Sequence, residues 1–339
     1  MTGAVRAQVL RRQGPVDGTS LSAEAIIPED PGPGEVRLAV RACGVCHTDL
    51  HIVEGDLPAH RLPLIPGHQI VGMVEAVGPG VDRPAVGERV GVGWLAGTCG
   101  RCDFCTQGLE NLCPQARFTG YDRDGGYAER TIVPAAYAFP LPPRFSDAQA
   151  APLLCAGIIG YRSLGQAGAA QARRLALYGF GGSAHLALQV AVHQGKEVAV
   201  VTRGEAHRRI ARELGAAWVG GPGDPPPWAP DAAVVFAPSG QVVREALGAV
   251  RAGGTVAINA IHLDGLPEMP YRLLYQERTL KSVTNYTRDD ARAFLRLAES
   301  IPVQVEVETF PLESASDVLL RLKRRQLKVA GVLRAAVDP

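Results

Sequence analysis

The second half of the chain alternates nearly continuous apolar runs with helical stretches, and this alternation limits the possible folds more than any other feature. Strands that are covered on both faces need continuous apolarity, and four runs have it: RRLALYGF, EVAVVT, AAVVFAP and GTVAINA. The stretches between them have helical periodicity: HLALQVAVHQ, RRIARELGA and VREALGAV. The pattern predicts a βαβ series built around a parallel sheet.

The first part of the chain, from Ala4 to about Pro140, has a different texture. Short β-branched runs are broken by Gly and Pro, which is typical of a β-rich domain with irregular loops: EVRLAV, IVGMVEAVG, RVGVGWL and RTIVP. After a charged amphipathic helix, NYTRDDARAFLRLAE, the tail returns to strand-like runs, and we expect it to rejoin the first sheet. The predicted fold class is α/β, with residues 1–151 and 287–339 forming a split β-rich domain around an inserted parallel-sheet domain, 152–286.

Composition narrows the class of function. A chain of 339 residues with a net charge of +1 has no basic stripe for nucleic acid, which favours a small-molecule substrate. The N-terminus does not resemble a signal peptide, and no window is apolar over the roughly 18 residues of a membrane span. We expect a cytoplasmic protein with no membrane and no nucleic-acid partner, in which seven cysteines serve as metal ligands, nucleophiles or buried residues.

One segment, GTCGRCDFCTQGLENLC, concentrates four of the cysteines. Their spacing lets four thiolates converge on one tetrahedral Zn²⁺, and because four ligands leave no open position, the site should be structural. An iron–sulfur cluster takes the same number of cysteines and is an alternative, as are four unconnected thiols. We place this lobe at about residues 94–115, and its predicted ligands are Cys99, Cys102, Cys105 and Cys113.

A glycine turn follows the first apolar strand of the parallel sheet, in LALYGFGGSAHLALQVA. Glycines between a strand and a helix let the backbone approach a pyrophosphate, whose charge the helix N-terminus stabilises. Ala184 replaces the usual third glycine, and Ala still permits close packing of helix on strand. The predicted dinucleotide-binding residues here are Gly179, Gly181, Gly182 and Ser183.

The next strand ends at Thr202 and Arg203, where an acidic residue would accept the ribose hydroxyls of NAD. Without a carboxylate nothing repels a 2′-phosphate, and a guanidinium can bind one. The sequence therefore favours NADP over NAD. If Arg203 is only a solvated loop residue or stacks on the adenine, NAD is fully possible as the cofactor.

Three cysteines lie outside the four-cysteine segment: Cys43, Cys46 and Cys155. A catalytic zinc needs about three protein ligands and one open position. His68 follows a Pro-Gly turn at the start of a strand, and Cys155 opens an apolar helix. The set Cys46, His68 and Cys155 would bring ligands from three distant parts of the chain to the boundary between the domains.

Several motifs together resemble those of the zinc-dependent medium-chain alcohol dehydrogenases over nearly the whole chain: GVCHTDLH, PGHQIVG, GTCGRCDFCTQGLENLC, GGYAE, APLLCAGIIGY and GFGGSA. The resemblance implies a GroES-like catalytic domain split around a Rossmann domain with a doubly wound parallel sheet. It also implies two zinc ions per chain, one catalytic and one structural, and reversible hydride transfer between an alcohol and NAD(P). The partner would be a small alcohol, aldehyde or ketone, and the protein a homodimer or homotetramer.

Matched position by position, the resemblance makes Cys46 a zinc ligand with His68 and Cys155, and leaves Cys43 as a buried apolar residue. Thr48 resembles the hydroxyl that hydrogen-bonds the reacting oxygen. His51 resembles the outer end of a proton relay. Further positions match a carboxylate that orients the ligand histidine, a cation near the pyrophosphate and two substrate-pocket residues: Asp49, His47, Trp94 and Leu57, respectively. The remaining histidines we interpret as structural or solvated: His60, His185, His193, His207 and His262.

Two positions depart from the family pattern. Gln69 replaces a glutamate that can join the zinc coordination, and Val332 replaces a basic residue near the C-terminus, with Arg334 two positions on. A polyol or sugar dehydrogenase would share the motifs and differ in its pocket. A zinc-free quinone or enoyl reductase would lack the ligands, and a nucleic-acid-binding zinc ribbon would lack the glycine turn.

Overall fold

The structure is a computed structural model that describes residues 3–260 and 263–335, so His262 lies outside the described residues. The chain forms two compact units. The first comprises the described parts of residues 1–155, 287–299 and 305–339, and the second comprises residues 156–286 and 300–304. Among the described residues, no helix is both long and apolar enough to cross a membrane.

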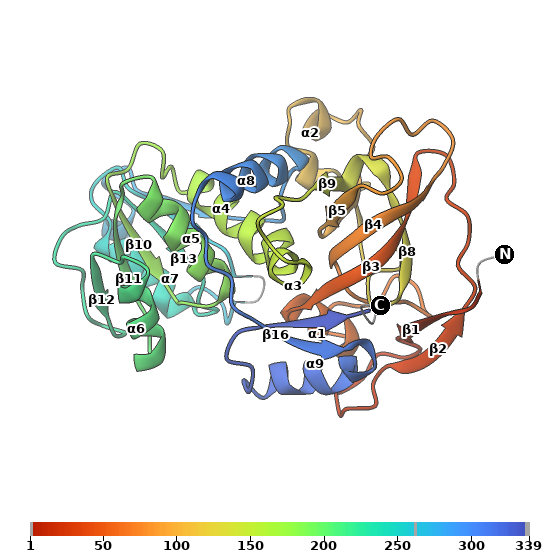
Figure 1. The fold of residues 1–339 in the computed structure, drawn as a ribbon. Coiled ribbons are helices and arrows are strands. Elements are labelled where there is room, and N and C mark those ends of the chain that lie inside the picture. Colours follow the sequence, from red (N-terminus) through yellow and green to blue (C-terminus); the bar gives the residue numbers. More distant parts are fainter. Residues whose placement is uncertain (1–2, 261–262, 336–339) are drawn as a thin grey trace. The chain divides into compact units, whose positions relative to one another are not determined.

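The main sheet of the first unit is organised around β3 (Glu35–Val45). Its strand order is β16-β17-β3-β4-β5-β9, and β8 also pairs with β3 (Figure 1). The tail joins this sheet because β17 pairs antiparallel with β3. The other strands are β4 (Gln69–Val77), β5 (Arg89–Val92), β8 (Arg130–Pro134), β9 (Ala138–Pro140), β16 (Val307–Pro311) and β17 (Ala330–Arg334).

Smaller elements surround this sheet. Two further ribbons pair antiparallel: β1 (Val5–Val9) with β2 (Ser22–Ile26), and β6 (Leu95–Gly97) with β7 (Arg117–Phe118). The helices and 3₁₀ turns of this unit are α1 (His47–Glu54), α2 (Asp103–Thr106), η1 (Glu110–Leu112), η2 (Ala135–Tyr137), α3 (Asp147–Ala150), η3 (Ala151–Leu154), α8 (Arg288–Ser300), η5 (Leu312–Ser314) and α9 (Ala315–Lys323). The sequence predicts one strand for the run RVGVGWL, but the structure has two. β5 ends before Gly93, and β6 begins after Trp94.

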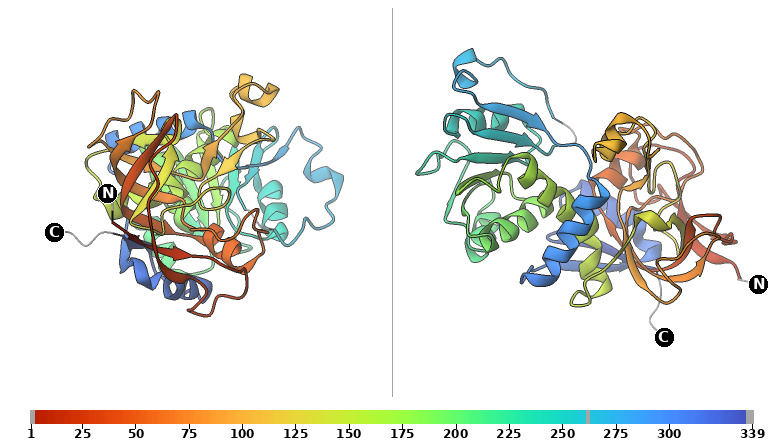
Figure 2. Two further views of the ribbon diagram at one scale, coloured as in Figure 1. Left: turned by 90° about the vertical axis from the view of Figure 1, so that its right-hand side faces the viewer. Right: turned by 90° about the horizontal axis from the view of Figure 1, so that it is seen from above.

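The second unit is a parallel sheet with strand order β12-β11-β10-β13-β14-β15, and helices cover it on both faces (Figure 1, Figure 2). This is the 3-2-1-4-5-6 order of a doubly wound nucleotide-binding sheet. The strands are β10 (Arg174–Tyr178), β11 (Glu197–Val201), β12 (Trp218–Gly220), β13 (Ala232–Val235), β14 (Thr255–Ile258) and β15 (Thr279–Ser282). The helices and turn are α4 (Ala156–Gln166), α5 (Gly182–His193), α6 (Glu205–Glu213), α7 (Gly240–Ala249) and η4 (Tyr271–Leu273).

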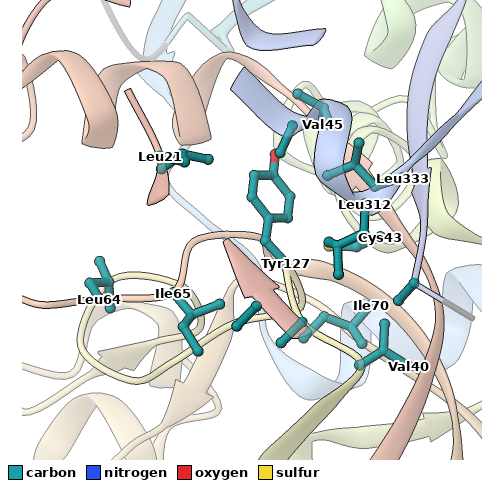
Figure 3. Packing of buried hydrophobic residues seen from close by; sticks show 14 of the residues in the cluster. Leu21, Val40, Cys43, Val45, Leu64, Ile65, Ile70, Tyr127, Leu312 and Leu333 are labelled. Carbon is teal, nitrogen blue, oxygen red and sulfur yellow. The ribbon is translucent and has the colours of Figure 1, made fainter. Parts of the chain in front are cut away.

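Apolar side chains from β3, β4, α1 and the tail form the core of the first unit (Figure 3). Cys43 on β3 is completely buried there, as expected of a small apolar residue, together with Tyr127 and Ile70. Burying a side chain of the size of Ile70 stabilises the fold by about 1.5–3 kcal/mol. This core therefore supports two segments that pack near Cys43: α1 and the turn before β4.

Candidate metal centres and nucleotide site

The first group of candidate metal ligands brings together Cys46, His68 and Cys155, whose ligand atoms lie within 4.8 Å of one another. Cys46 is the N-cap of α1, directly after β3. His68 follows Gly67, whose φ of +97° is a left-handed turn that favours glycine. Cys155 follows η3. The Sγ of Cys46 lies 3.5 Å from Nε2 of His68, which is the separation that two ligands of a tetrahedral zinc have, about 3.5 Å.

Asp49 connects two of these ligands. Its carboxylate accepts the backbone N–H of Cys46 at 2.9 Å through Oδ2 and faces Nδ1 of His68 at 2.9 Å through Oδ1. The side chain of Asp49 is fully buried, so its position is fixed by these partners. With Nδ1–H donated to the carboxylate, Nε2 of His68 carries the lone pair that a metal needs.

The pKa values of Cys46 and His68 are shifted in opposite directions, which favours a thiolate beside an imidazolium when no metal is bound. The thiol of Cys155 and then the imidazole of His68 lower the pKa of Cys46 well below its ordinary value, against the opposing effect of burial. Burial works against a charged His68, but Asp49 and then Cys46 outweigh it and raise the pKa of His68 well above its ordinary value. Because a metal ligand must be deprotonated, a metal ion here would displace that proton.

Helix α1 also carries the predicted relay residues. Thr48 and His51 are three positions apart, so both side chains project from one face of the helix. Nδ1 of His51 lies 2.8 Å from the carboxylate of Asp56, whose side chain is half exposed. His47, at the first position of α1, is exposed.

The two predicted pocket residues lie in different surroundings. The ring of Trp94 meets that of His68 edge-on at 5.2 Å and stacks on Phe118 at 4.9 Å, so it stands directly beside a candidate ligand. Leu57 follows the end of α1 and is partly buried against the core. Trp94 therefore contacts a residue of the candidate centre directly, whereas Leu57 packs against the core.

The four cysteines of the lobe form the second group, again with ligand atoms within 4.8 Å of one another. Sγ of Cys105 lies 3.9 Å from that of Cys99 and 3.6 Å from that of Cys102. Thiolates on one tetrahedral zinc are about 3.8 Å apart, whereas a disulfide needs about 2.05 Å. The backbone N–H groups of Arg101 and Cys102 lower the pKa of Cys99 to about 6, whereas burial and then the Cys102 thiol raise the pKa of Cys105 to about 11. The residues fit one ion, and the space is too small for a multi-iron cluster.

The lobe is attached to α8 through Glu110. Its carboxylate accepts two hydrogen bonds from Arg288, one from Nη2 and one from the backbone N–H, each at 2.7 Å. The guanidinium also lies over the ring of Tyr137, 4.9 Å from its centroid. Although burial opposes it, pairing with Arg288 lowers the pKa of Glu110.

The glycine turn has the geometry that a pyrophosphate requires. Gly179 has φ of +88°, and an added Cβ would lie 2.8 Å from the backbone N of Ala237, so only glycine fits. At Gly181, by contrast, nothing among the described residues lies within 4 Å of an added Cβ, and none of their side chains caps the N-terminus of α5. The open space and the uncapped N–H groups of Gly182 and Ser183 suit an anion. Ala184 is fully buried.

Thr202 and Arg203 lie at the same edge of the parallel sheet as the glycine turn. Tyr178 of β10 pairs in register with Val201 of β11, so Gly179 and Thr202 leave neighbouring strands side by side. The Thr202 side chain is buried and that of Arg203 is exposed. A dinucleotide whose pyrophosphate occupies the glycine turn would present its ribose at this edge.

Comparisons with known proteins agree with this geometry. The chain matches the alcohol dehydrogenase GroES-like domain over residues 32–143 and the zinc-binding dehydrogenase domain over residues 182–300. It is 49% identical over 338 residues to the probable alcohol dehydrogenase AdhA of Mycobacterium tuberculosis, covering 98% of each chain. The chain belongs to the zinc-dependent medium-chain dehydrogenase family.

Further proteins are similar to this chain over most of their length. An alcohol dehydrogenase of Geobacillus stearothermophilus is 38% identical, covering 89% of this chain and 92% of that protein. Among solved structures, AibC matches with a TM-score of 0.90 and 28% identity over 98% of this chain and 96% of that one. A thermostable alcohol dehydrogenase from Pyrobaculum aerophilum matches with a TM-score of 0.87 and 25% identity over 98% and 99%.

Membership of the medium-chain dehydrogenases confirms the predicted fold class and the predicted class of enzyme, an NAD(P)-dependent alcohol dehydrogenase. The two departures from the family pattern both lie inside the main sheet. Gln69 is buried, and its Oε1 would lie 2.6 Å from a Cβ added at Gly44, the residue it pairs with. Val332 on β17 is completely buried opposite Gly44, and Arg334 is exposed.

Three residues beside the site were missed by sequence reasoning in this medium-chain dehydrogenase. The first is Asp56, which pairs with His51. Gly55 could have indicated this pair, because a glycine that ends a helix turns the next residue, Asp56, back toward the helix. Glu110 and Tyr127 lie in motifs that carry the family resemblance, GLENLC and GGYAE, but their partners are distant in sequence. Spacing alone could not assign those partners.

Proposed function

We propose that the catalytic zinc of this alcohol dehydrogenase is held by Cys46, His68 and Cys155, and that the structural zinc is held by the four cysteines of the lobe. The observation that carries this assignment is the carboxylate of Asp49, which is buried and engages both the N–H of Cys46 and the Nδ1 of His68. Such a carboxylate is typical of a histidine that ligates zinc. Three protein ligands leave the fourth position to substrate.

Zinc, when bound, would supply a Lewis acid that polarises the alcohol or carbonyl oxygen, and the nicotinamide would accept or donate the hydride. The protein's own residues would handle the proton. The hydroxyl of Thr48 would hydrogen-bond the reacting oxygen, and His51 would pass the proton outward. Nδ1 of His51 faces the carboxylate of Asp56, so this carboxylate would stabilise the imidazolium that forms when His51 takes up the proton.

We propose NADP(H) as the preferred cofactor, bound by the glycine turn, Ser183, Thr202 and Arg203, with His47 near the pyrophosphate. Among the described residues, no ion pair of Arg203 is found, and the one acid at the start of α6, Glu205, pairs with Arg208 and Arg212. A solved relative, a putative zinc-binding dehydrogenase from Sinorhizobium meliloti, is bound to NADP. Its TM-score is 0.86 at 25% identity, over 98% of this chain and all of that one.

The cofactor assignment is tested by Arg203→Ser. We expect wild-type kcat/KM to be higher with NADPH than with NADH, and Arg203→Ser to lower the NADPH value about tenfold or more while leaving the NADH value nearly unchanged. The reason is that only NADPH carries the phosphate that the guanidinium can bind. A clear preference of the wild type for NADH would refute the assignment.

We further propose that the first unit is the catalytic domain and the second the nucleotide-binding domain, with boundaries near residues 151 and 287. A homodimer or homotetramer is proposed because β15 ends the order of the parallel sheet, and because Tyr271 and Tyr275 shortly before it are 73% and 70% exposed. All seven cysteines lie in described residues and are free, which suits the reducing cytoplasm.

The substrate class is tested by assaying the zinc-loaded enzyme on simple alcohols, aldehydes and polyols. We expect turnover of aldehydes, with Trp94 and Leu57 lining the pocket, and a lower kcat/KM for large aldehydes. Treatment with a chelator should abolish turnover, and added zinc should restore it. Turnover of polyols without turnover of simple aldehydes or alcohols would replace this assignment with a polyol dehydrogenase.

A further inference from the structure

The turn that carries His68 is held from behind by the segment Gly125–Tyr127. The backbone N–H of Gly125 donates to Ile65, that of Gly126 to Gly67 and that of Tyr127 to Pro66, at 2.7, 2.8 and 3.0 Å. Three consecutive donors therefore follow the backbone of the turn up to the residue before His68.

The ring of Tyr127 closes the same contact. A Cβ added at Gly67 would lie 2.4 Å from Cδ1 of Tyr127 and 2.9 Å from Sγ of Cys43. The ring is completely buried, next to Cys43 and Ile70 in the packed core (Figure 3). The turn before His68 thus packs between the Tyr127 ring and Cys43 of β3, and a side chain larger than that of glycine would not fit at Gly67.

The hydroxyl of Tyr127 is unusual in this setting. It is buried, and no described residue meets hydrogen-bond geometry with it. A buried hydroxyl without a partner is destabilising, because it has lost its hydrogen bonds to water. The ring contacts Gly67, and the next residue, His68, faces the fully buried carboxylate of Asp49 at 2.9 Å through Nδ1, so this carboxylate lies beside the turn that the ring packs on. Consistent with this, burial and then the charge of Asp49 raise the pKa of Tyr127 well above its ordinary value.

We propose that Tyr127 is a positioning residue of the catalytic zinc site: its ring fixes the Gly67 turn, and its hydroxyl donates a hydrogen bond to Asp49 in the zinc-loaded protein. Asp49 has two other donors, the Cys46 N–H and His68, and a carboxylate can accept more than two hydrogen bonds. A third donor would hold the fully buried carboxylate in the orientation in which it aligns both ligands. The inference rests on the proposed function of Cys46, His68 and Cys155.

The test is zinc retention in Tyr127→Phe, which keeps the ring and removes only the hydroxyl. Wild type and variant are titrated with a chelator, and both zinc content and activity are followed. Removing a carboxylate that supports a ligand typically changes metal affinity by about 10–100-fold. Tyr127 would support such a carboxylate only indirectly, so its removal should have a smaller effect. We therefore expect Tyr127→Phe to lose half of its catalytic zinc at a chelator concentration about three- to tenfold lower than the wild type needs. Zinc in the four-cysteine lobe of the same molecules should be retained as in the wild type.

Tyr178→Phe is the matched control, because it removes another buried tyrosine hydroxyl, on β10 of the second unit. It should leave the chelator titration unchanged. Equal zinc retention in Tyr127→Phe and wild type, with the variant as stable or more stable, would show that the hydroxyl has no partner and would overturn the inference. A wild type without a second, catalytic zinc would instead overturn the proposed function.

Discussion

A single short helix, α1, carries several of the residues that we propose act in binding zinc and in catalysis. Within six residues it presents Cys46 at its N-cap, Thr48 and His51 on one face and Asp49 on the buried face. The i, i+3 spacing of Thr48 and His51 allows both to serve one proton path, while Asp49 turns inward to His68. The division of labour follows from helix geometry, since neighbouring residues must point in different directions.

Thr48→Ala should therefore lower kcat by about 10²–10⁴-fold, because it removes the hydroxyl that we propose carries the proton from the reacting oxygen. Thr48→Ser is the matched control and should keep most of the activity, since the hydroxyl remains. The measurement is the rate of hydride transfer with a deuterated alcohol, which shows whether that step limits turnover. Wild-type turnover by Thr48→Ala with hydride transfer limiting would remove Thr48 from the mechanism.

Cys43→Ala should retain both zinc ions and the activity. Cys43 is buried on β3 and its sulfur packs against the backbone at Gly67 and Gly126, so it serves packing. Removing one buried sulfur should lower the free energy of unfolding by about 1 kcal/mol. Zinc analysis and denaturant unfolding check both parts, and loss of one zinc from this variant would make Cys43 a ligand after all.

At the scale of elements, the four-cysteine lobe is tied to a distant segment of the chain. Glu110 of η1 binds both the side chain and the backbone N–H of Arg288 at the start of α8, and the pair is separated by 178 residues in sequence. The side chain of Glu110 is only 9% exposed, while that of Arg288 is 31% exposed. The lobe thus fixes the point at which the chain returns to the first unit.

Glu110→Gln should lower the free energy of unfolding by about 1–2 kcal/mol, between the values for exposed and for buried ion pairs. The folded-state pKa of Glu110 is lowered, so its contribution is fully present above the unfolded pKa of about 4.3 and is lost as pH falls through the folded value. Denaturant unfolding of the zinc-loaded protein should therefore give the same loss at pH 7 and pH 6.

Glu313→Gln is the control for that experiment. Glu313 pairs with Arg6, and the two side chains are 47% and 50% exposed. A pair this exposed contributes about 0–1 kcal/mol, so the variant should unfold nearly as the wild type does. If Glu110→Gln and Glu313→Gln were equally mild, the lobe would not anchor α8 in the way described.

At the scale of the whole molecule, periodicity predicted the parallel sheet well, because strands covered on both faces must be continuously apolar. The alternating runs of the first unit were harder: RVGVGWL divides into two strands at Gly93–Trp94, and a glycine inside a strand weakens it. Ligand types could be read from the sequence, since thiols and imidazoles are few. Partners such as Asp56 for His51, or Arg288 for Glu110, depend on tertiary contacts that spacing does not encode.

Zinc content per chain, in the wild type and in Cys155→Ser, tests the central claim most directly. Freshly purified wild type should contain about two zinc per chain, because both ligand groups have the spacing of a tetrahedral zinc site. Cys155→Ser should contain about one and should lose its alcohol dehydrogenase activity, with the lobe still loaded. One or no zinc in untreated wild type, or two zinc and full activity in Cys155→Ser, would contradict the assignment.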